Sequence, residues 1–92
     1  MRSKARLTYK KGDVDMNKNQ QITYMQARLV RLAAEEWNTS IKEVASLFTE
    51  FKVLQFIREC FEIFCAESDY AVLDDIVEYL DNKGIKVGAG II

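Results

Sequence analysis

The residues most able to do chemistry in this sequence lie near its C-terminal end: Asp74, Asp75, Glu78, Tyr79 and Asp81. On a helix, Asp74, Glu78 and Asp81 share one face because they are spaced i, i+4 and i+7, and Asp75 lies beside them. Carboxylate oxygens suit Mg²⁺ or Ca²⁺, but metal sites draw ligands from several elements and no calcium-loop pattern is present. A like-charged face is most often solvated, and next most often it binds a protein. We therefore predict no metal and no cofactor, and we treat these five residues as candidate partner-binding residues.

Nucleophilic chemistry finds little support in the composition. The sequence has no histidine, which removes Ser-His and Cys-His pairs, histidine-ligated metals and the usual proton shuttle near neutral pH. Cys60 and Cys65 are five residues apart, a spacing that points them to different faces of a helix and disfavours a local disulfide. The glutamates around them raise a thiol pKa, which opposes reactivity. An enzyme would need a carboxylate or a cysteine to move protons, and no paired constellation is visible, so we predict that the protein is not an enzyme.

The first 18 residues carry the opposite charge. They hold six basic and two acidic residues, a net charge of +4, whereas residues 19–92 hold seven basic and twelve acidic residues, a net charge of −5. A basic arm can bind nucleic acid or an anionic surface, and its candidate residues are Arg2, Lys4, Arg6, Lys10 and Lys11. The segment lacks a sustained apolar period, which predicts a disordered leader. In a bacterial gene the codons of residues 11–13 can contain a ribosome-binding sequence, so we also expect native translation to start at Met16.

Segments of helical periodicity must position these residues. The most apolar is VLQFIRECFEIF, residues 53–64, where positions 53, 56, 57, 60, 61 and 64 form one helical face that Leu54 and Ile63 widen. Such a broad stripe predicts the most enclosed helix of the domain, at 53–65. Similar stripes predict helices at 20–37, 41–51 and 72–83, with residues 70–72 briefly extended. Ser40 and Glu43 form a capping box, residues 38–40 end the first helix, and Gly84 predicts a left-handed helix end.

The fold prediction is therefore all-α. We expect a basic, disordered N-terminal leader at 1–18 and a single helical domain at 19–92, a compact bundle of four short helices. No apolar run approaches the roughly 18 residues of a membrane span, and the basic start is not followed by the apolar segment of a secretory signal, so a cytoplasmic protein is expected. The number of large apolar and aromatic side chains is high for a chain of 92 residues. We predict a homodimer that covers a patch around Tyr24, Tyr79 and Ile85.

Several of these residues together resemble a known family. They are Trp37, Ser40, Glu43-Val44, Leu47-Phe48, Tyr70, Val72, Asp74-Asp75-Ile76, Glu78-Tyr79-Leu80 and Gly84. Over about residues 20–84 the chain resembles the short bacterial proteins of domain-of-unknown-function family 3791, most clearly in the D-D-I-x-E-Y-L run. Family members carry a Tyr-Asp-x-Leu-His-Thr-like run where this chain has residues 60–65, so the histidine of that run is absent here. The resemblance implies a small helical protein without an assigned activity. Members are often encoded beside ADP-ribosyltransferase-like proteins, so the resemblance implies a protein partner or an antitoxin-like role.

Two functions remain in view. The first is a non-catalytic protein–protein interaction module, an antitoxin-like partner of a neighbouring gene product. The alternative is a small nucleic-acid-binding regulator that uses the basic arm. Helices 41–51 and 53–65 could imitate a helix-turn-helix, but Glu59 and Glu62 on the outward face of the second helix oppose phosphate. Nucleic acid is therefore the less favoured partner.

Overall fold

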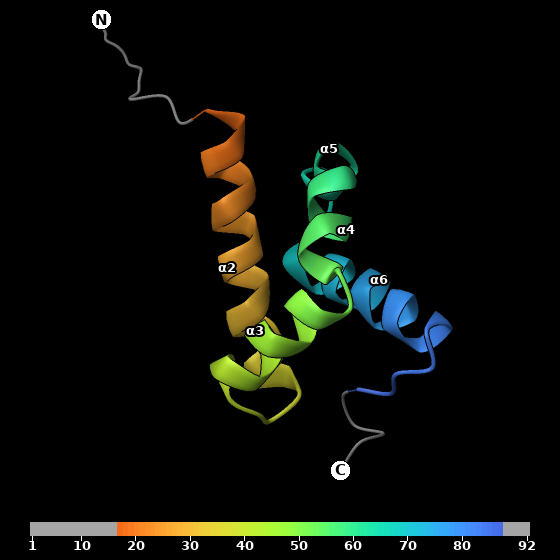
Figure 1. Ribbon diagram of the computed structural model, residues 1–92. Coiled ribbons are helices and arrows are strands. Elements are labelled where there is room, and N and C mark those ends of the chain that lie inside the picture. Colours follow the sequence, from red (N-terminus) through yellow and green to blue (C-terminus); the bar gives the residue numbers. More distant parts are fainter. Residues whose placement is uncertain (1–16, 88–92) are drawn as a thin grey trace, which may run out of the picture.

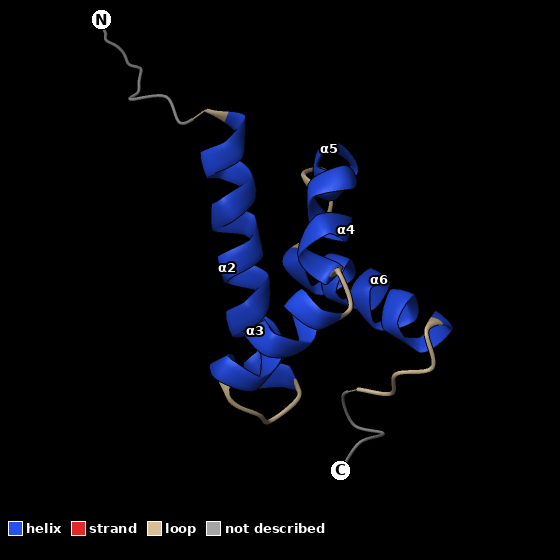
Figure 2. Ribbon diagram, viewed as in Figure 1, coloured by secondary structure: helices blue, strands red, loops and turns tan. Residues whose placement is uncertain are grey.

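A computed structural model describes residues 17–87 as an all-helical fold, and residues 1–16 and 88–92 lie outside the described part. The helices are α2 (Lys18–Glu36), α3 (Ile41–Glu50), α4 (Val53–Glu59), α5 (Phe61–Phe64) and α6 (Asp69–Asn82). No strand occurs in the described range, as Figure 2 shows. The all-α prediction is confirmed. The predicted disorder of the leader falls on residues 1–18, of which 1–16 are outside the described range.

The longest helix, α2, is the one around which the others pack. It contacts α3, α4 and α6, and Figure 1 shows it along one side of the molecule with α4 and α5 on the other. Its buried face holds Ile22, Met25, Leu29, Ala33 and their neighbours Val30 and Ala34. At the end of α2 the buried Trp37 meets the fully buried Phe48 of α3 edge-on, with ring centroids 6.2 Å apart. Burying each large apolar side chain contributes roughly 1.5–3 kcal/mol, so α2 is a major source of core stability.

The segment 53–64 is less enclosed than its sequence predicts. Its buried residues are Val53, Ile57, Phe61 and Phe64, one narrow row. Phe56 is only half-buried, and Ile63 is 65% exposed. The predicted broad apolar face is therefore only partly covered, because the neighbouring helices bury that row and leave Phe56 and Cys60 half-buried. The predicted single helix is also interrupted at Cys60. The junction carries neither glycine nor proline, and hydrogen bonds bridge it, from Cys60 N to Phe56 O (3.0 Å) and from Phe64 N to Cys60 O (2.8 Å).

Side-chain caps define where three of the helices begin. Asn17 and Gln20 form a capping box at the start of α2, with Asn17 Oδ1 accepting from Gln20 N at 2.9 Å and Gln20 Oε1 accepting from Asn17 N at 3.1 Å. The Ser40 hydroxyl accepts from Glu43 N at 3.0 Å, as predicted. The Ser68 hydroxyl accepts from Ala71 N at 3.1 Å, so α6 begins at Asp69 and not near residue 72. The expected extended stretch at 70–72 was wrong because Ser68 caps the helix one turn earlier.

Two of the turns are built on Schellman motifs. After α6, Ile85 N donates to Leu80 O and Gly84 N to Asp81 O, both at 2.9 Å, with Gly84 at φ 85° as predicted. After α2, Asn38 takes the same left-handed place at φ 54°. The short turn between α3 and α4 rests on Lys52, a residue with a Cβ, at φ 62°. None of the helices in the described range is both long and apolar enough to cross a membrane.

Candidate functional site

Tyr79 of α6 is the best-anchored of the candidate residues. Its ring stacks on Phe56 of α4, with centroids 4.3 Å apart and planes 16° from parallel. Its hydroxyl donates to Phe51 O at 3.0 Å, in the turn between α3 and α4. The Lys83 ammonium lies over the ring, 5.0 Å from its centroid. Because Phe56 covers one face of the ring, Lys83 must cover the other. Tyr79 therefore ties α6 to the α3–α4 turn and has little freedom to reorient.

Tyr79 forms one wall of a hollow that we call the α4–α6 groove. The groove has a volume of about 320 Å³ and is lined by Phe56, Cys60, Phe64, Asp75, Glu78, Tyr79 and Asn82. Its floor is aromatic, since Phe56 also meets Phe64 edge-on at 5.5 Å. This volume is at the lower end of the range for small-ligand sites, about 300–1,000 Å³. The groove can therefore hold a side chain or a small group on an aromatic surface.

Carboxylates gather along this groove. Asp75 and Glu78 line it directly, and Glu67, in the loop before α6, lies within hydrogen-bonding reach of Asp75. Desolvation, and then the charge and hydrogen bond of Asp75, raise the pKa of Glu67. Burial raises the pKa of the Cys60 thiol, and the nearby Glu59 and Asp75 carboxylates raise it further. The groove is consequently an acidic environment that keeps its cysteine protonated, which is the opposite of what a nucleophilic thiol needs.

The structure places the five candidate partner-binding residues in different surroundings. Asp75, Glu78 and Tyr79 line the α4–α6 groove. Asp74 is exposed and is not among the lining residues. Asp81 pairs with Lys86, beyond the end of α6. The sequence did not predict the other side of the groove, which consists of Phe56, Cys60 and Phe64. Only their packing against α6 reveals them.

The residues proposed for a nucleic-acid arm, Arg2, Lys4, Arg6, Lys10 and Lys11, lie outside the described residues. Among residues 17–87 no three acidic or cysteine side chains are grouped so that they could hold a metal ion.

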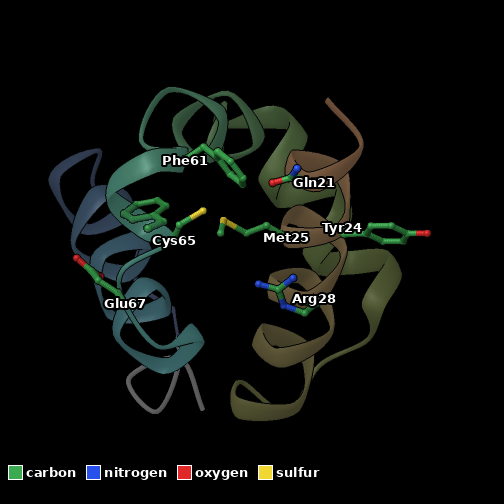
Figure 3. Close-up of a pocket in the computed structure, with 8 residues that line it drawn as sticks. Gln21, Tyr24, Met25, Arg28, Phe61, Cys65 and Glu67 are labelled. Atoms are coloured by element: carbon green, nitrogen blue, oxygen red, sulfur yellow. The ribbon is translucent and has the colours of Figure 1, made fainter. Parts of the chain in front are cut away.

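A second hollow lies between α2 and α5 (Figure 3). It has a volume of about 280 Å³, and Figure 3 shows the Met25 and Cys65 sulfurs turned toward each other across it, while Tyr24 points away. Arg28 lines it, but its guanidinium is already held by Asp69 at 3.0 and 3.2 Å. That hydrogen bond raises the pKa of Arg28, against the opposing effect of burial. The basic side chain of this pocket is therefore already paired, and Glu67 also lines it, whereas Asp75 and Glu78 of the α4–α6 groove make no ion pair in the described range.

The apolar patch expected to support a homodimer is not assembled as predicted. Tyr24 is 58% exposed, but Tyr79 and Ile85 are half-buried and pack against the core. The large apolar residues that are most exposed are Tyr24, Ile41, Ile63 and Tyr70. Ile85 packs inward because it follows the Schellman turn, in which a residue at its position contacts the last turn of the helix. The homodimer itself remains a prediction.

Comparison with known proteins gives one match. The family described as "Protein of unknown function (DUF3791)" matches residues 24–83, more than half of the chain and the part that contains the α4–α6 groove. No curated protein and no solved structure matches.

Proposed function

Since this chain belongs to the DUF3791 family of proteins of unknown function, we propose that it is a non-catalytic protein–protein interaction module, an antitoxin-like partner of a neighbouring gene product. The observation that carries the proposal is the α4–α6 groove, where an aromatic floor lies beside carboxylates. Among residues 17–87 no basic side chain forms an ion pair with these carboxylates. Aromatic anchors surrounded by polar groups are typical of the energetic centres of protein interfaces. The proposal explains why the folded part is acidic and why its cysteine environment opposes nucleophilic chemistry.

The rigidity of Tyr79 supports binding in particular. Association is weakened when side chains must be ordered at the interface, at about 0.5–1.5 kcal/mol for each immobilised flexible side chain. Stacking on Phe56 and the hydrogen bond to Phe51 O already fix the Tyr79 ring in the unbound protein. The groove is therefore preorganised, and a partner loses little affinity to ordering it.

The test is co-expression with the product of the neighbouring gene, followed by purification through a tag on one of the two proteins. We expect the two proteins to purify together in a fixed ratio. The double variant Asp75→Lys, Glu78→Lys should abolish this, because it reverses the charge of the groove wall without touching the aromatic floor. The control is Glu36→Lys, at an exposed carboxylate at the end of α2, and this variant should co-purify normally.

Co-purification that survives the double variant would contradict the assignment of the groove. Absence of any complex with the neighbouring product would contradict the antitoxin-like role. Retention of the full chain by DNA or RNA at low salt, lost when the arm lysines and arginines are replaced with glutamine, would favour the alternative of a nucleic-acid-binding regulator.

A further inference from the structure

Asp75 and Glu78 line the α4–α6 groove, and the Asp75 carboxyl forms a like-charge pair with that of Glu67, which lines the hollow between α2 and α5. The Asp75 and Glu67 carboxyls lie within hydrogen-bonding reach of one another, and two carboxylates so placed repel each other when both are ionised. The ion pairs between described residues use other acids, in the pairs Lys18–Glu62, Arg28–Asp69 and Lys86–Asp81. Lys83, which lies over the Tyr79 ring, makes no ion pair in the described range. Residues 17–87 therefore leave the Asp75 and Glu78 carboxylates of the groove without an ion-pair partner, and their charge is complementary to a cation from outside.

The aromatic floor restricts what kind of cation fits. Phe56 is half-buried, so part of its ring faces the groove between Phe64 and Tyr79. A cation held over aromatic rings and beside carboxylates gains from both kinds of contact. Mg²⁺ and Ca²⁺ prefer oxygen ligands to aromatic rings, and the described residues group no three ligands for a metal ion. Phosphate groups of a nucleic acid would be repelled by the same carboxylates.

We propose that the α4–α6 groove binds an arginine side chain presented by a basic segment of the partner protein. A planar guanidinium can lie against the part of the Phe56 ring that faces the groove while its N–H groups donate to the Asp75 and Glu78 carboxylates, which line it. Lysine fits less well, because its compact ammonium is strongly hydrated and cannot form two parallel hydrogen bonds. This inference rests on the proposed function in one respect only, namely that the arginine belongs to a partner protein. The chemistry of the groove can be tested without that partner.

The experiment titrates the full-length, isotopically labelled protein with a blocked pentapeptide of alternating glycine and arginine, followed by NMR. We expect shifts concentrated at Cys60, Asp75 and Tyr79. Matched peptides carry lysine or citrulline at the arginine positions, and citrulline keeps the shape of arginine without its charge. The arginine peptide should bind about tenfold more tightly than the citrulline peptide, as expected for losing a charge-assisted hydrogen bond, with lysine between them.

Two protein variants locate the binding. Asp75→Asn and Glu78→Gln should each weaken binding of the arginine peptide about fivefold to tenfold. Neither substitution threatens folding, because neither carboxylate takes part in an ion pair between described residues. Glu36→Gln, which makes the same change in net charge on α2, should bind the arginine peptide as the unaltered protein does.

Equal binding of the arginine and citrulline peptides, or unchanged binding by Asp75→Asn, would overturn the proposal. The same shifts produced by Mg²⁺ or Ca²⁺ alone would assign the groove to metal ions. Shifts at Asp75 caused by Lys10→Gln and Lys11→Gln without peptide would assign it to this chain's own basic arm.

The two proposals fail separately. If the groove binds the arginine peptide but the protein forms no complex with the neighbouring gene product, the proposed groove chemistry is supported and the proposed partner is contradicted. If the complex forms but the groove does not bind the arginine peptide, the partner is supported and the arginine site is contradicted.

Discussion

Replacing Tyr79 with phenylalanine tests how strongly α6 holds the turn between α3 and α4. The substitution keeps the ring, and with it the stacking on Phe56 at 4.3 Å, but removes the hydroxyl that donates to Phe51 O at 3.0 Å. A hydrogen bond between neutral groups contributes about 0.5–1.5 kcal/mol net, and the half-buried carbonyl keeps some access to water. We therefore expect Tyr79→Phe to lower the free energy of unfolding by about 1 kcal/mol. For a domain of this size that lowers Tm by roughly 4–8 °C.

A second substitution separates the hydroxyl from the ring. Tyr79→Leu also removes the aromatic pair with Phe56, which contributes about 0.5–1.5 kcal/mol beyond the buried area, so the total loss should be about 2 kcal/mol. The control is Tyr24→Phe, at a side chain that is 58% exposed, and it should change stability by less than about 0.5 kcal/mol.

The assay is urea denaturation followed by the fluorescence of Trp37, the single tryptophan, which is buried against Phe48. The variants should shift the midpoint and leave the slope of the transition unchanged. If Tyr79→Phe were as stable as the unaltered protein, the hydroxyl would not be holding the turn. If it lost as much stability as Tyr79→Leu, the ring stacking would contribute nothing, and the account of Tyr79 as a preorganised anchor would fail.

Three further predictions follow from the backbone and the charges. Lys52→Gly should raise the free energy of unfolding by about 0.5–1 kcal/mol in urea denaturation, because Lys52 sits at φ 62°, where a Cβ is unfavourable, and a loss of stability would contradict this reading. Glu67 has a raised pKa in the folded state, so its contribution to stability is fully present below the ordinary glutamate pKa of about 4.3 and is lost as pH rises through the raised value. Glu67→Gln should therefore be more stable than the unaltered protein at neutral pH and no more stable at acidic pH, whereas a pH-independent difference in urea midpoint would exclude repulsion by Asp75 as the cause. Cys65 is exposed and Cys60 is half-buried with a raised thiol pKa, so iodoacetamide should alkylate Cys65 first, and mass spectrometry showing the reverse order would refute the environment assigned to Cys60.

The local signals in the sequence predicted the helices because helix formation depends on features that repeat along the chain. Apolar spacing located each helix, Ser40 marked one start, and Gly84 marked one end. Two starts were readable but missed: the Asn-x-x-Gln box at Asn17 and the serine before α6 at Ser68. The interruption at Cys60 could not have been predicted from a residue type, since neither glycine nor proline lies there.

Local signals of this type could not predict the α4–α6 groove, because its two sides come from separate parts of the chain. The sequence alone predicted that Asp75 and Tyr79 lie on one helix and that, being four residues apart, they are neighbours on its surface. It could not show that Phe56 would stack on Tyr79, because that contact depends on how α4 packs against α6.

Only the tertiary structure decided which acids are neutralised. The sequence counts the charges, but Asp69 is paired by Arg28, 41 residues away, and Glu62 by Lys18, 44 residues away. Pairing over such distances depends on helix packing, since side chains on one helix meet only at three or four residues apart. The same packing brings the Glu67 and Asp75 carboxyls together, and no basic side chain among residues 17–87 forms an ion pair with either of them. The sequence thus determined that the folded part is acidic, and the fold determined where that charge is left available to a partner.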